Sequence, residues 1–236
     1  MPVDGRRAAL FLRFALALVV CGPGGAQAAG LKVMALGDSI TVGTGSSHGG
    51  GYRSTFWVRM RDAGFEVDMV GGKVDGPDTF DNRHQGYAQM PLHELSADVH
   101  EKLRMYQPDV VLLLTGTDEA RSNSFSPHAF AANLGVMIDR IFTAKRDVKL
   151  LISTVPPARF GRSNQGTKRA LNELLRRTVR ERGERGEAVF LVESFATLDP
   201  TRDMADTDHP NDAGYERIGE AFADALLVAL GAEPIE

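Results

Sequence analysis

The feature that most constrains this chain is a regular alternation between short apolar runs and longer stretches with helical periodicity. Five runs have the length and apolar character of strands, at residues 31–36, 66–70, 109–114, 148–154 and 188–192. Apolar residues recur at helical spacing in four further stretches, at residues 52–63, 126–143, 171–179 and 218–226. Strands that alternate with helices form a parallel sheet with helices on both faces. The sequence therefore predicts a three-layer α/β/α domain with a five-stranded parallel sheet.

The remaining segments predict a single domain behind a cleaved leader. Residues 71–86 are rich in Gly, Asp, Asn and Pro and have no clear period, which favours a long loop at the rim of the sheet. Near the N-terminus, Arg6 and Arg7 precede an apolar run too short to span a bilayer, and residues 26–28 form an A-x-A cleavage site. We predict a signal peptide over residues 1–28, a mature domain over residues 29–236, and a secreted or periplasmic protein without a stable membrane span.

Two other interpretations of the N-terminus stay open. The apolar run can act as an uncleaved membrane anchor. Cys21, the only cysteine, can be acylated in a lipoprotein, although the bulky Val20 before it fits such sites poorly. Cleavage after residue 28 would leave a domain without cysteine, and therefore without disulfides or thiol chemistry.

The charge pattern argues against a nucleic-acid ligand, because the formal net charge is −4 and the arginines are scattered along the chain. The six histidines show no paired spacing suited to zinc, and the run GTGSSH at residues 43–48 lacks the third glycine of a dinucleotide fingerprint. The sequence thus predicts no metal and no cofactor. It predicts a substrate that is a small molecule, a glycan or lipid-like.

A serine directly after the first predicted strand is the first candidate catalytic residue. In the run LGDSIT at residues 36–41, Ser39 follows the carboxyl end of a strand, which is where open α/β sheets present ligands. The same run is compatible with a plain turn in which Ser39 caps the following segment. A nucleophilic role therefore requires a base elsewhere in the chain.

The run DTDHPN at residues 206–211, just before the last predicted helix, contains a candidate base. Serine is a weak nucleophile by itself, and a histidine oriented by a carboxylate activates it. His209 is the candidate base, and Asp206, three residues earlier on the same turn, is the candidate orienting carboxylate. Asp208, adjacent to His209, is a competing carboxylate.

These runs and their order resemble the SGNH (GDSL) hydrolases. GDSIT at residues 37–41 resembles the first block of that family, and DxxHPNxxG at residues 206–214 resembles the last. The resemblance also covers segments at residues 51–53, 67–71, 84–86, 114–116 and 154–157, and it looks closest to carbohydrate esterases that deacetylate plant polysaccharides. It implies a flavodoxin-like sheet of order 2-1-3-4-5 and ester hydrolysis through an acyl-serine intermediate. Ser39, Asp206 and His209 would form the triad.

The resemblance also implies an oxyanion hole, and two of its positions depart from the family pattern. The hole would use the backbone amide of Ser39, a backbone amide of the second block and an asparagine side chain of the third. Gln89 stands at the usual glycine of the second block, with Gly86 as the alternative in a shifted register. Asp118, in GTDE at residues 116–119, replaces the asparagine. An ionised carboxylate has no proton to donate to an oxyanion.

Three interpretations of Asp118 stay open. Its carboxyl is protonated, because burial near other acids raises a carboxyl pKa; another donor such as Asn123 takes its place; or the protein has little hydrolase activity. We favour a working but slow or pH-sensitive esterase, because the triad is complete. Asp38, Gly86 and Tyr87 flank these positions and are candidate substrate contacts.

The predicted function is therefore that of a secreted serine esterase that hydrolyses small, acetyl-sized acyl esters, with a carbohydrate as the expected alcohol part. One alternative is acyl transfer to a sugar hydroxyl by the same triad. The other is a glycan-binding protein that keeps the fold with weak catalysis. The acyl length, the alcohol part and the oligomeric state are left open by the sequence.

Overall fold

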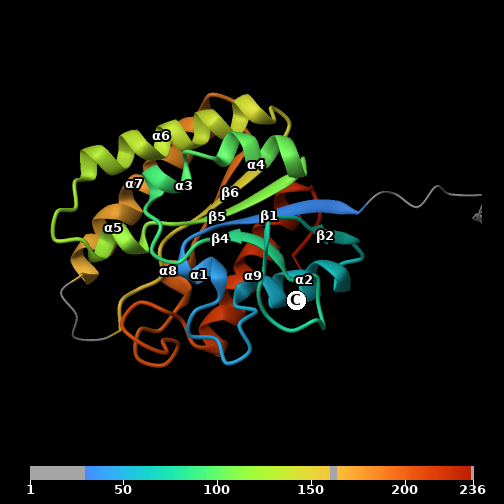
Figure 1. The fold of residues 1–236 in the computed structure, drawn as a ribbon, viewed down its shortest axis with the longest axis horizontal. Coiled ribbons are helices and arrows are strands. Elements are labelled where there is room, and N and C mark those ends of the chain that lie inside the picture. Colours follow the sequence, from blue (N-terminus) through green and yellow to red (C-terminus); the bar gives the residue numbers. More distant parts are fainter. Residues whose placement is uncertain (1–29, 160–163, 235–236) are drawn as a thin grey trace, which may run out of the picture.

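The computed structural model describes residues 30–159 and 164–234, and Figure 1 shows a central sheet between two layers of helices. The strands are β1 (Leu31–Gly37), β2 (Val67–Met69), β3 (Lys73–Val74), β4 (Arg83–Gly86), β5 (Val110–Leu114), β6 (Lys149–Ser153) and β7 (Val189–Val192). The five predicted strands are β1, β2, β5, β6 and β7, which pair in parallel in the spatial order β2-β1-β5-β6-β7. The predicted order 2-1-3-4-5 is confirmed for these strands. The predicted signal peptide and Cys21 lie outside the described residues.

The prediction of a five-stranded sheet bordered by a long loop was wrong between residues 71 and 86. This segment contains β3 and β4, so within the described residues the sheet is mixed and has seven strands. β4 pairs in parallel with the carboxyl end of β1, where Gly86 lies opposite Gly37, and β3 pairs with β4 in the antiparallel direction. Strand β4 was missed because its sequence, RHQG, is polar although its last three residues are buried.

The two faces of the sheet pack against different helices because alternate residues of a strand point to opposite sides. From β1, Met34 and Leu36 belong to one core cluster, together with residues of α3, α4, α6 and α7. Val33 and Ala35 belong to the other, together with residues of α2 and α9. Figure 1 shows these two sets of helices on opposite sides of the strands.

The four predicted helices are present. They are α2 (Tyr52–Asp62), α6 (Pro127–Ala144), α7 (Gln165–Glu184) and α9 (Asp212–Ala229). α6 begins as predicted, because the Ser126 hydroxyl accepts a hydrogen bond from the Ala129 amide and Pro127 occupies the first turn. The remaining helices are α1 (Ser39–Val42), α3 (Leu92–Leu95), α4 (Val99–Tyr106), α5 (Thr117–Arg121) and α8 (Ser194–Thr197). α1 and α5 begin at the carboxyl ends of β1 and β5, and so they position the residues discussed below.

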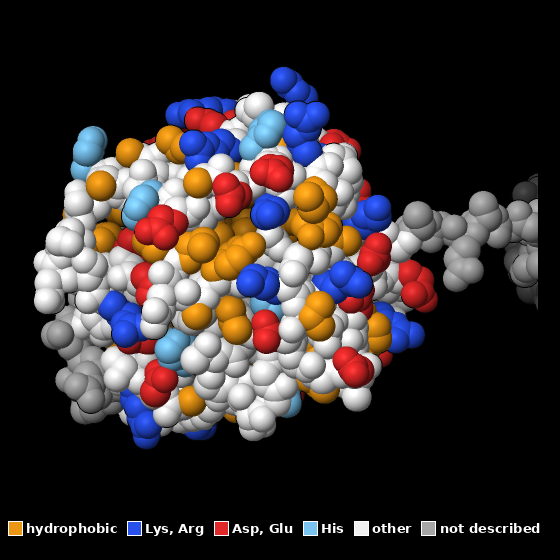
Figure 2. All heavy atoms as spheres, in the orientation of Figure 1, with side chains coloured by type: hydrophobic (Ala, Val, Ile, Leu, Met, Phe, Trp, Pro, Cys, Tyr) orange, Lys and Arg blue, Asp and Glu red, His pale blue; other side chains and the backbone are white. Residues whose placement is uncertain are grey.

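The surface carries mixed charge. On the face drawn in Figure 2, acidic and basic side chains are interspersed and neither sign forms a continuous area. Across the two described ranges, no helix is both long enough and apolar enough to cross a membrane.

Candidate active site

Ser39 is the first residue of α1 and lies directly after β1. The Asp38 carboxylate fixes this junction: one oxygen accepts a hydrogen bond from the Ile40 amide at 3.0 Å, and the other accepts from the Thr117 amide at 3.1 Å. Asp38 is completely buried, and its burial raises the pKa of its carboxyl while these hydrogen bonds oppose the rise. Asp38 therefore ties the end of β1 to the end of β5. Its burial leaves it no surface for the substrate contact we predicted.

A glycine is needed where β1 passes β5. A Cβ atom on Gly37 would lie 1.9 Å from the Leu114 carbonyl oxygen, so any larger residue would push the two strand ends apart. This close approach places Ser39, on α1, beside α5, which follows β5. The glycine before the Asp-Ser pair thus has a steric role in bringing two segments of the site together.

The structure brings Ser39, His209 and Asp206 into one hydrogen-bonded chain. The Ser39 hydroxyl lies 2.9 Å from His209 Nε2, and His209 Nδ1 lies 2.8 Å from an Asp206 carboxylate oxygen. Partial burial of Asp206 is outweighed by hydrogen bonds from the Asp208 and His209 amides and from the His209 ring, which hold the pKa of Asp206 below its ordinary value. An ionised carboxylate only accepts, so Nδ1 carries the ring proton and Nε2 is free to accept the serine proton.

Asp208, the competing carboxylate, is turned away from the histidine ring. One of its oxygens lies 2.9 Å from the Lys168 ammonium and accepts a hydrogen bond of 2.7 Å from the Asn164 side chain. Both partners belong to α7 or to the residue before it. The geometry therefore distinguishes two carboxylates that the sequence left as alternatives.

Gly86 and Tyr87 are used by the fold. The Gly86 amide donates to His84 Nδ1 at 2.9 Å, and the Tyr87 amide donates to the Gly37 carbonyl at 2.9 Å. Burial, with a contribution from the Arg53 guanidinium, lowers the pKa of His84 to about 4, so its ring is neutral and accepts from Gly86. Neither amide is free for an oxyanion, and the substrate contacts predicted at these positions stay predictions.

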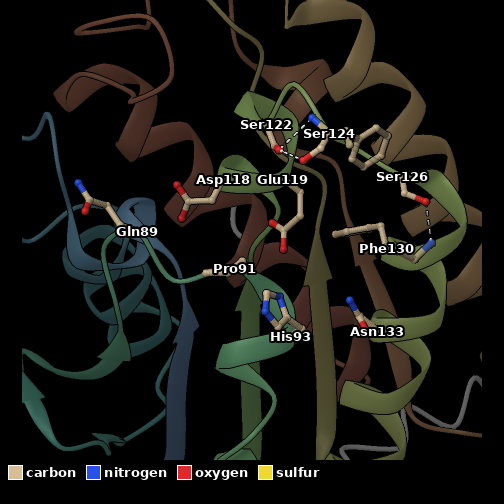
Figure 3. Close-up of a pocket in the computed structure, with 12 residues that line it drawn as sticks. Gln89, Pro91, His93, Asp118, Glu119, Ser122, Ser124, Ser126, Phe130 and Asn133 are labelled. Carbon is tan, nitrogen blue, oxygen red and sulfur yellow. Dashed lines mark hydrogen bonds between the residues drawn. The ribbon is translucent and has the colours of Figure 1, made fainter.

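Gln89 is the remaining predicted donor of the second block. Its φ angle is +62°, in the left-handed region that non-glycine residues rarely adopt. This explains why the resemblance expects glycine at the position. Gln89 lines the same cavity as Asp118, and Figure 3 shows the two residues at the same end of it.

Asp118 lies in the first turn of α5, and one of its carboxylate oxygens is buried without a hydrogen-bond partner among the described residues. Burial raises the pKa of the Asp118 carboxyl, and the nearby Asp208 adds to this rise, whereas Arg121 and His209 oppose it. His209, the candidate base, is thus one of the charges that act on Asp118. Asn123, the alternative donor, is exposed in the turn after α5, between Ser122 and Ser124, which line the cavity.

The cavity beside Asp118 has a volume of about 420 Å³ (Figure 3). It opens between α5, the start of α6 and the segment that leads into α3. Its wall combines carboxylates, hydroxyls and amides with two phenylalanine rings. The lining residues are Gln89, Pro91, His93, Asp118, Glu119, Ser122, Ser124, Phe125, Ser126, Ala129, Phe130 and Asn133.

Arg53 is an important residue that sequence reasoning did not single out. Its buried guanidinium donates five hydrogen bonds of 2.8 to 3.0 Å to backbone carbonyls of α1 and of the loops around it. The acceptors are the carbonyls of Thr41, Val42, Gly49, Asp75 and Asn82. Because these carbonyls are spread from Thr41 to Asn82, no local pattern around Arg53 reveals the role. Within the described ranges, no three His, Cys, Asp or Glu side chains are grouped so that they could hold a metal ion.

Comparison with known proteins adds a family match. The sequence model of the GDSL-like lipase/acylhydrolase family matches residues 35–217. A multidomain esterase from Ruminococcus flavefaciens is 25% identical over 241 residues, which cover 89% of this chain and 30% of that protein. The chain thus spans less than a third of the length of this relative.

Among solved structures, a family 3 carbohydrate esterase from Clostridium thermocellum is similar, with a TM-score of 0.74 and 25% identity. The alignment covers 85% of this chain and 97% of that one. A family 3 carbohydrate esterase from Talaromyces cellulolyticus has a TM-score of 0.73 and 22% identity, with 86% and 100% of the two chains covered. An acetyl xylan esterase from Geobacillus stearothermophilus has a TM-score of 0.63 and 18% identity, with 88% and 97% covered. The last two similarities bear on the fold alone.

Proposed function

Because this chain belongs to the GDSL-like lipase/acylhydrolase family, we propose that it is a serine esterase that removes small acyl groups, of acetyl size, from carbohydrate esters. The observation that carries this proposal is the hydrogen-bonded chain from Ser39 through His209 to Asp206. Such a chain is the arrangement that activates a serine hydroxyl at neutral pH.

In the proposed reaction, Ser39 Oγ attacks the ester carbonyl carbon while His209 Nε2 accepts its proton. His209 then returns that proton to the departing alkoxide, which leaves as the alcohol and yields an acyl-serine ester. Water attacks this ester in the second half, with His209 again acting as base and then as acid. Asp206 keeps the ring in the required tautomer and stabilises the imidazolium. The Ser39 and Gln89 amides would stabilise the oxyanion in both halves.

A carbohydrate as the alcohol part is supported by two observations. The similar structure at 25% identity is described as a carbohydrate esterase. The cavity beside Asp118 offers acceptors and donors from Glu119, Ser126 and Asn133 next to the rings of Phe125 and Phe130. A sugar presents both hydroxyls and apolar C–H faces, which suits a wall of this mixed kind. A long acyl chain would leave the polar groups without partners, at a cost in binding.

An acyl-length series tests the proposal. We expect kcat/KM on nitrophenyl esters to fall about tenfold or more from acetate to octanoate, because the polar groups of the mixed wall interrupt its apolar contact with a long chain. We also expect a fluorophosphonate probe to label the wild-type protein. A preference for octanoate would point to a lipid-like substrate. Absence of both labelling and hydrolysis from acid to neutral pH would instead favour a glycan-binding protein.

Acyl transfer to a sugar is the second candidate, since it uses the same residues and differs only in what attacks the acyl-serine ester. The wall just described can hold a sugar as acceptor as well as leaving group. Adding a free sugar during hydrolysis of nitrophenyl acetate and measuring acetylated sugar against acetate distinguishes the two.

We also propose export from the cytoplasm, on the basis of residues 1–28 alone.

Replacing Asp118 by asparagine is expected to raise activity most at neutral pH. A protonated Asp118 can donate to the oxyanion and an ionised one cannot, so this donor is lost as pH rises through the raised pKa of its carboxyl. The base His209, in contrast, must be unprotonated. The wild type therefore works only in the pH range where Asp118 is protonated and His209 is not. One missing donor costs about a hundredfold or more in rate. The ratio of Asp118→Asn to wild-type kcat/KM should therefore increase with pH, toward that size.

The same pH profiles can also contradict this role of Asp118. Both proteins are assayed on nitrophenyl acetate over the same range, with Ser122→Ala as a control at another lining residue of the cavity. Identical profiles for wild type and Asp118→Asn would remove Asp118 from the oxyanion hole.

A further inference from the structure

A buried lysine contacts the residue that precedes the candidate base. Lys168, in the first turn of α7, has no exposed side-chain surface, and its ammonium lies 2.9 Å from an Asp208 carboxylate oxygen. Burial lowers the pKa of Lys168, and Asp208 provides the largest opposing effect. A buried ammonium is costly unless it is paired. The pairing with Asp208 is therefore the condition under which this lysine can be charged inside the protein.

Asp208 connects three parts of the site. Its side chain is 8% exposed, and it receives Lys168 and Asn164 from the α7 side. Its second oxygen faces Arg121 of α5, at 3.7 Å from Nε. Asp208 also donates its amide to the Asp206 carboxylate at 2.8 Å and directly precedes His209. One carboxylate thus joins α7 and α5 to the turn that holds the base.

The charges around this pair are unbalanced without the lysine. Asp208 acts on Asp118, and Asp38 and Asp206 act on Lys168, so these groups lie within electrostatic reach of one another. Arg121 is half-exposed, so water weakens its effect. A reaction that forms an oxyanion would add one more negative charge. The acidic groups around His209 and Ser39 are Asp38, Asp118, Glu119, Asp206 and Asp208. The cations around them are Lys168, the half-exposed Arg121, and the exposed Arg159, whose guanidinium donates to the Ala205 carbonyl at 3.2 Å.

We propose that Lys168 is a positioning residue for the reaction at Ser39: it holds the 206–209 turn through Asp208, and its charge offsets the acidic groups around the base and the oxyanion. This inference rests on the proposed function, because it concerns the same reaction. It also explains how the site accommodates an aspartate at position 118. The compensating charge lies on α7, outside the short segments on which the resemblance to the family was based.

A double-mutant cycle tests the charge effect. Lys168→Met removes the ammonium and leaves Asp208 uncompensated, so the acid limb of kcat/KM should move to higher pH by on the order of one unit, with kcat reduced about tenfold. Asp208→Asn leaves Lys168 uncompensated, so the limb should move to lower pH. The double variant, which has neither charge, should return the limb to its wild-type position.

The control is Asn164→Ala, which removes a hydrogen bond to Asp208 without changing charge. It should lower kcat about threefold at most, and its acid limb should coincide with that of the wild type. Thermal unfolding is recorded for each variant. Should Lys168→Met fail to fold, Asp208→Asn and the double variant still give the opposite displacement and its reversal.

The outcomes separate this inference from the proposed function. An active, fluorophosphonate-labelled wild type with unmoved acid limbs in every folded variant overturns the role of Lys168 and leaves the esterase in place. Acid limbs that move in the same direction for both single variants also overturn the role of Lys168. A charge effect must move them in opposite directions, whereas a general loss of structure need not. A wild type that neither hydrolyses esters nor takes the label overturns the proposed function itself.

Discussion

Replacing Ser39 by alanine is expected to lower kcat on nitrophenyl acetate by about 10⁴-fold or more and to abolish labelling by a fluorophosphonate. Ser39 Oγ is the atom that the His209 ring is placed to deprotonate, at 2.9 Å. Without it, His209 has no oxygen to activate except that of water, and the acyl-enzyme route is closed. The remaining activity would come from binding and from the backbone amides alone.

The substitution should leave the fold unchanged. Ser39 lies in the first turn of α1, which is capped by the Asp38 side chain, and alanine is well tolerated in a helix. The melting temperature of Ser39→Ala should therefore lie within a few degrees of the wild type. A folded Ser39→Ala protein that retains activity within tenfold of the wild type would falsify the assignment of the nucleophile.

The second large effect is expected at Asp206. Asparagine at this position can still accept from the Asp208 and His209 amides, but it presents an NH₂ group to the His209 ring in place of an acceptor. Nδ1 would then lose its proton to Nε2, and Nε2 could no longer accept from Ser39. We expect kcat to fall about 10³-fold or more, as in other triads with this change.

Asp208→Asn is the matched control for Asp206→Asn. It is the same substitution, two residues away on the same turn, at a carboxylate that contacts Lys168 and Asn164 and is turned away from the ring. We expect its loss in kcat to be about tenfold at most. The comparison uses kcat at the pH optimum of each variant, so that a displaced profile is not mistaken for lost catalysis. Equal losses for the two variants would mean that Asp206 has no special role in orienting His209.

The sequence predicted most of the fold because its signals are local. Alternating strand and helix periodicity identified five strands and four helices, and a serine and a proline marked the start of α6. Strand β4 was missed because its burial comes from tertiary contacts: His84 is completely buried, and its Nε2 lies 3.0 Å from an Asp75 carboxylate oxygen. No apolar pattern in the sequence indicates this burial. The same limit applies to Arg53, whose five acceptors are spread over the residues from Thr41 to Asn82.

The candidate site divides in the same way. By itself, the sequence predicted the nucleophile, the base and their order along the chain, since each stands in a short run with a recognisable chemistry. Only the tertiary structure decided which carboxylate contacts the His209 ring, because Lys168 of α7 and Asn164 just before it, some forty residues away, hold Asp208 elsewhere. It also showed that the Gly86 and Tyr87 amides are used inside the fold, by His84 of β4 and Gly37 of β1, which leaves Gln89 as the donor that we propose for the second block. The direction of a side chain in a turn and the hydrogen bonding of a backbone amide both depend on partners that folding brings from distant segments. A local sequence pattern does not show which partners these are.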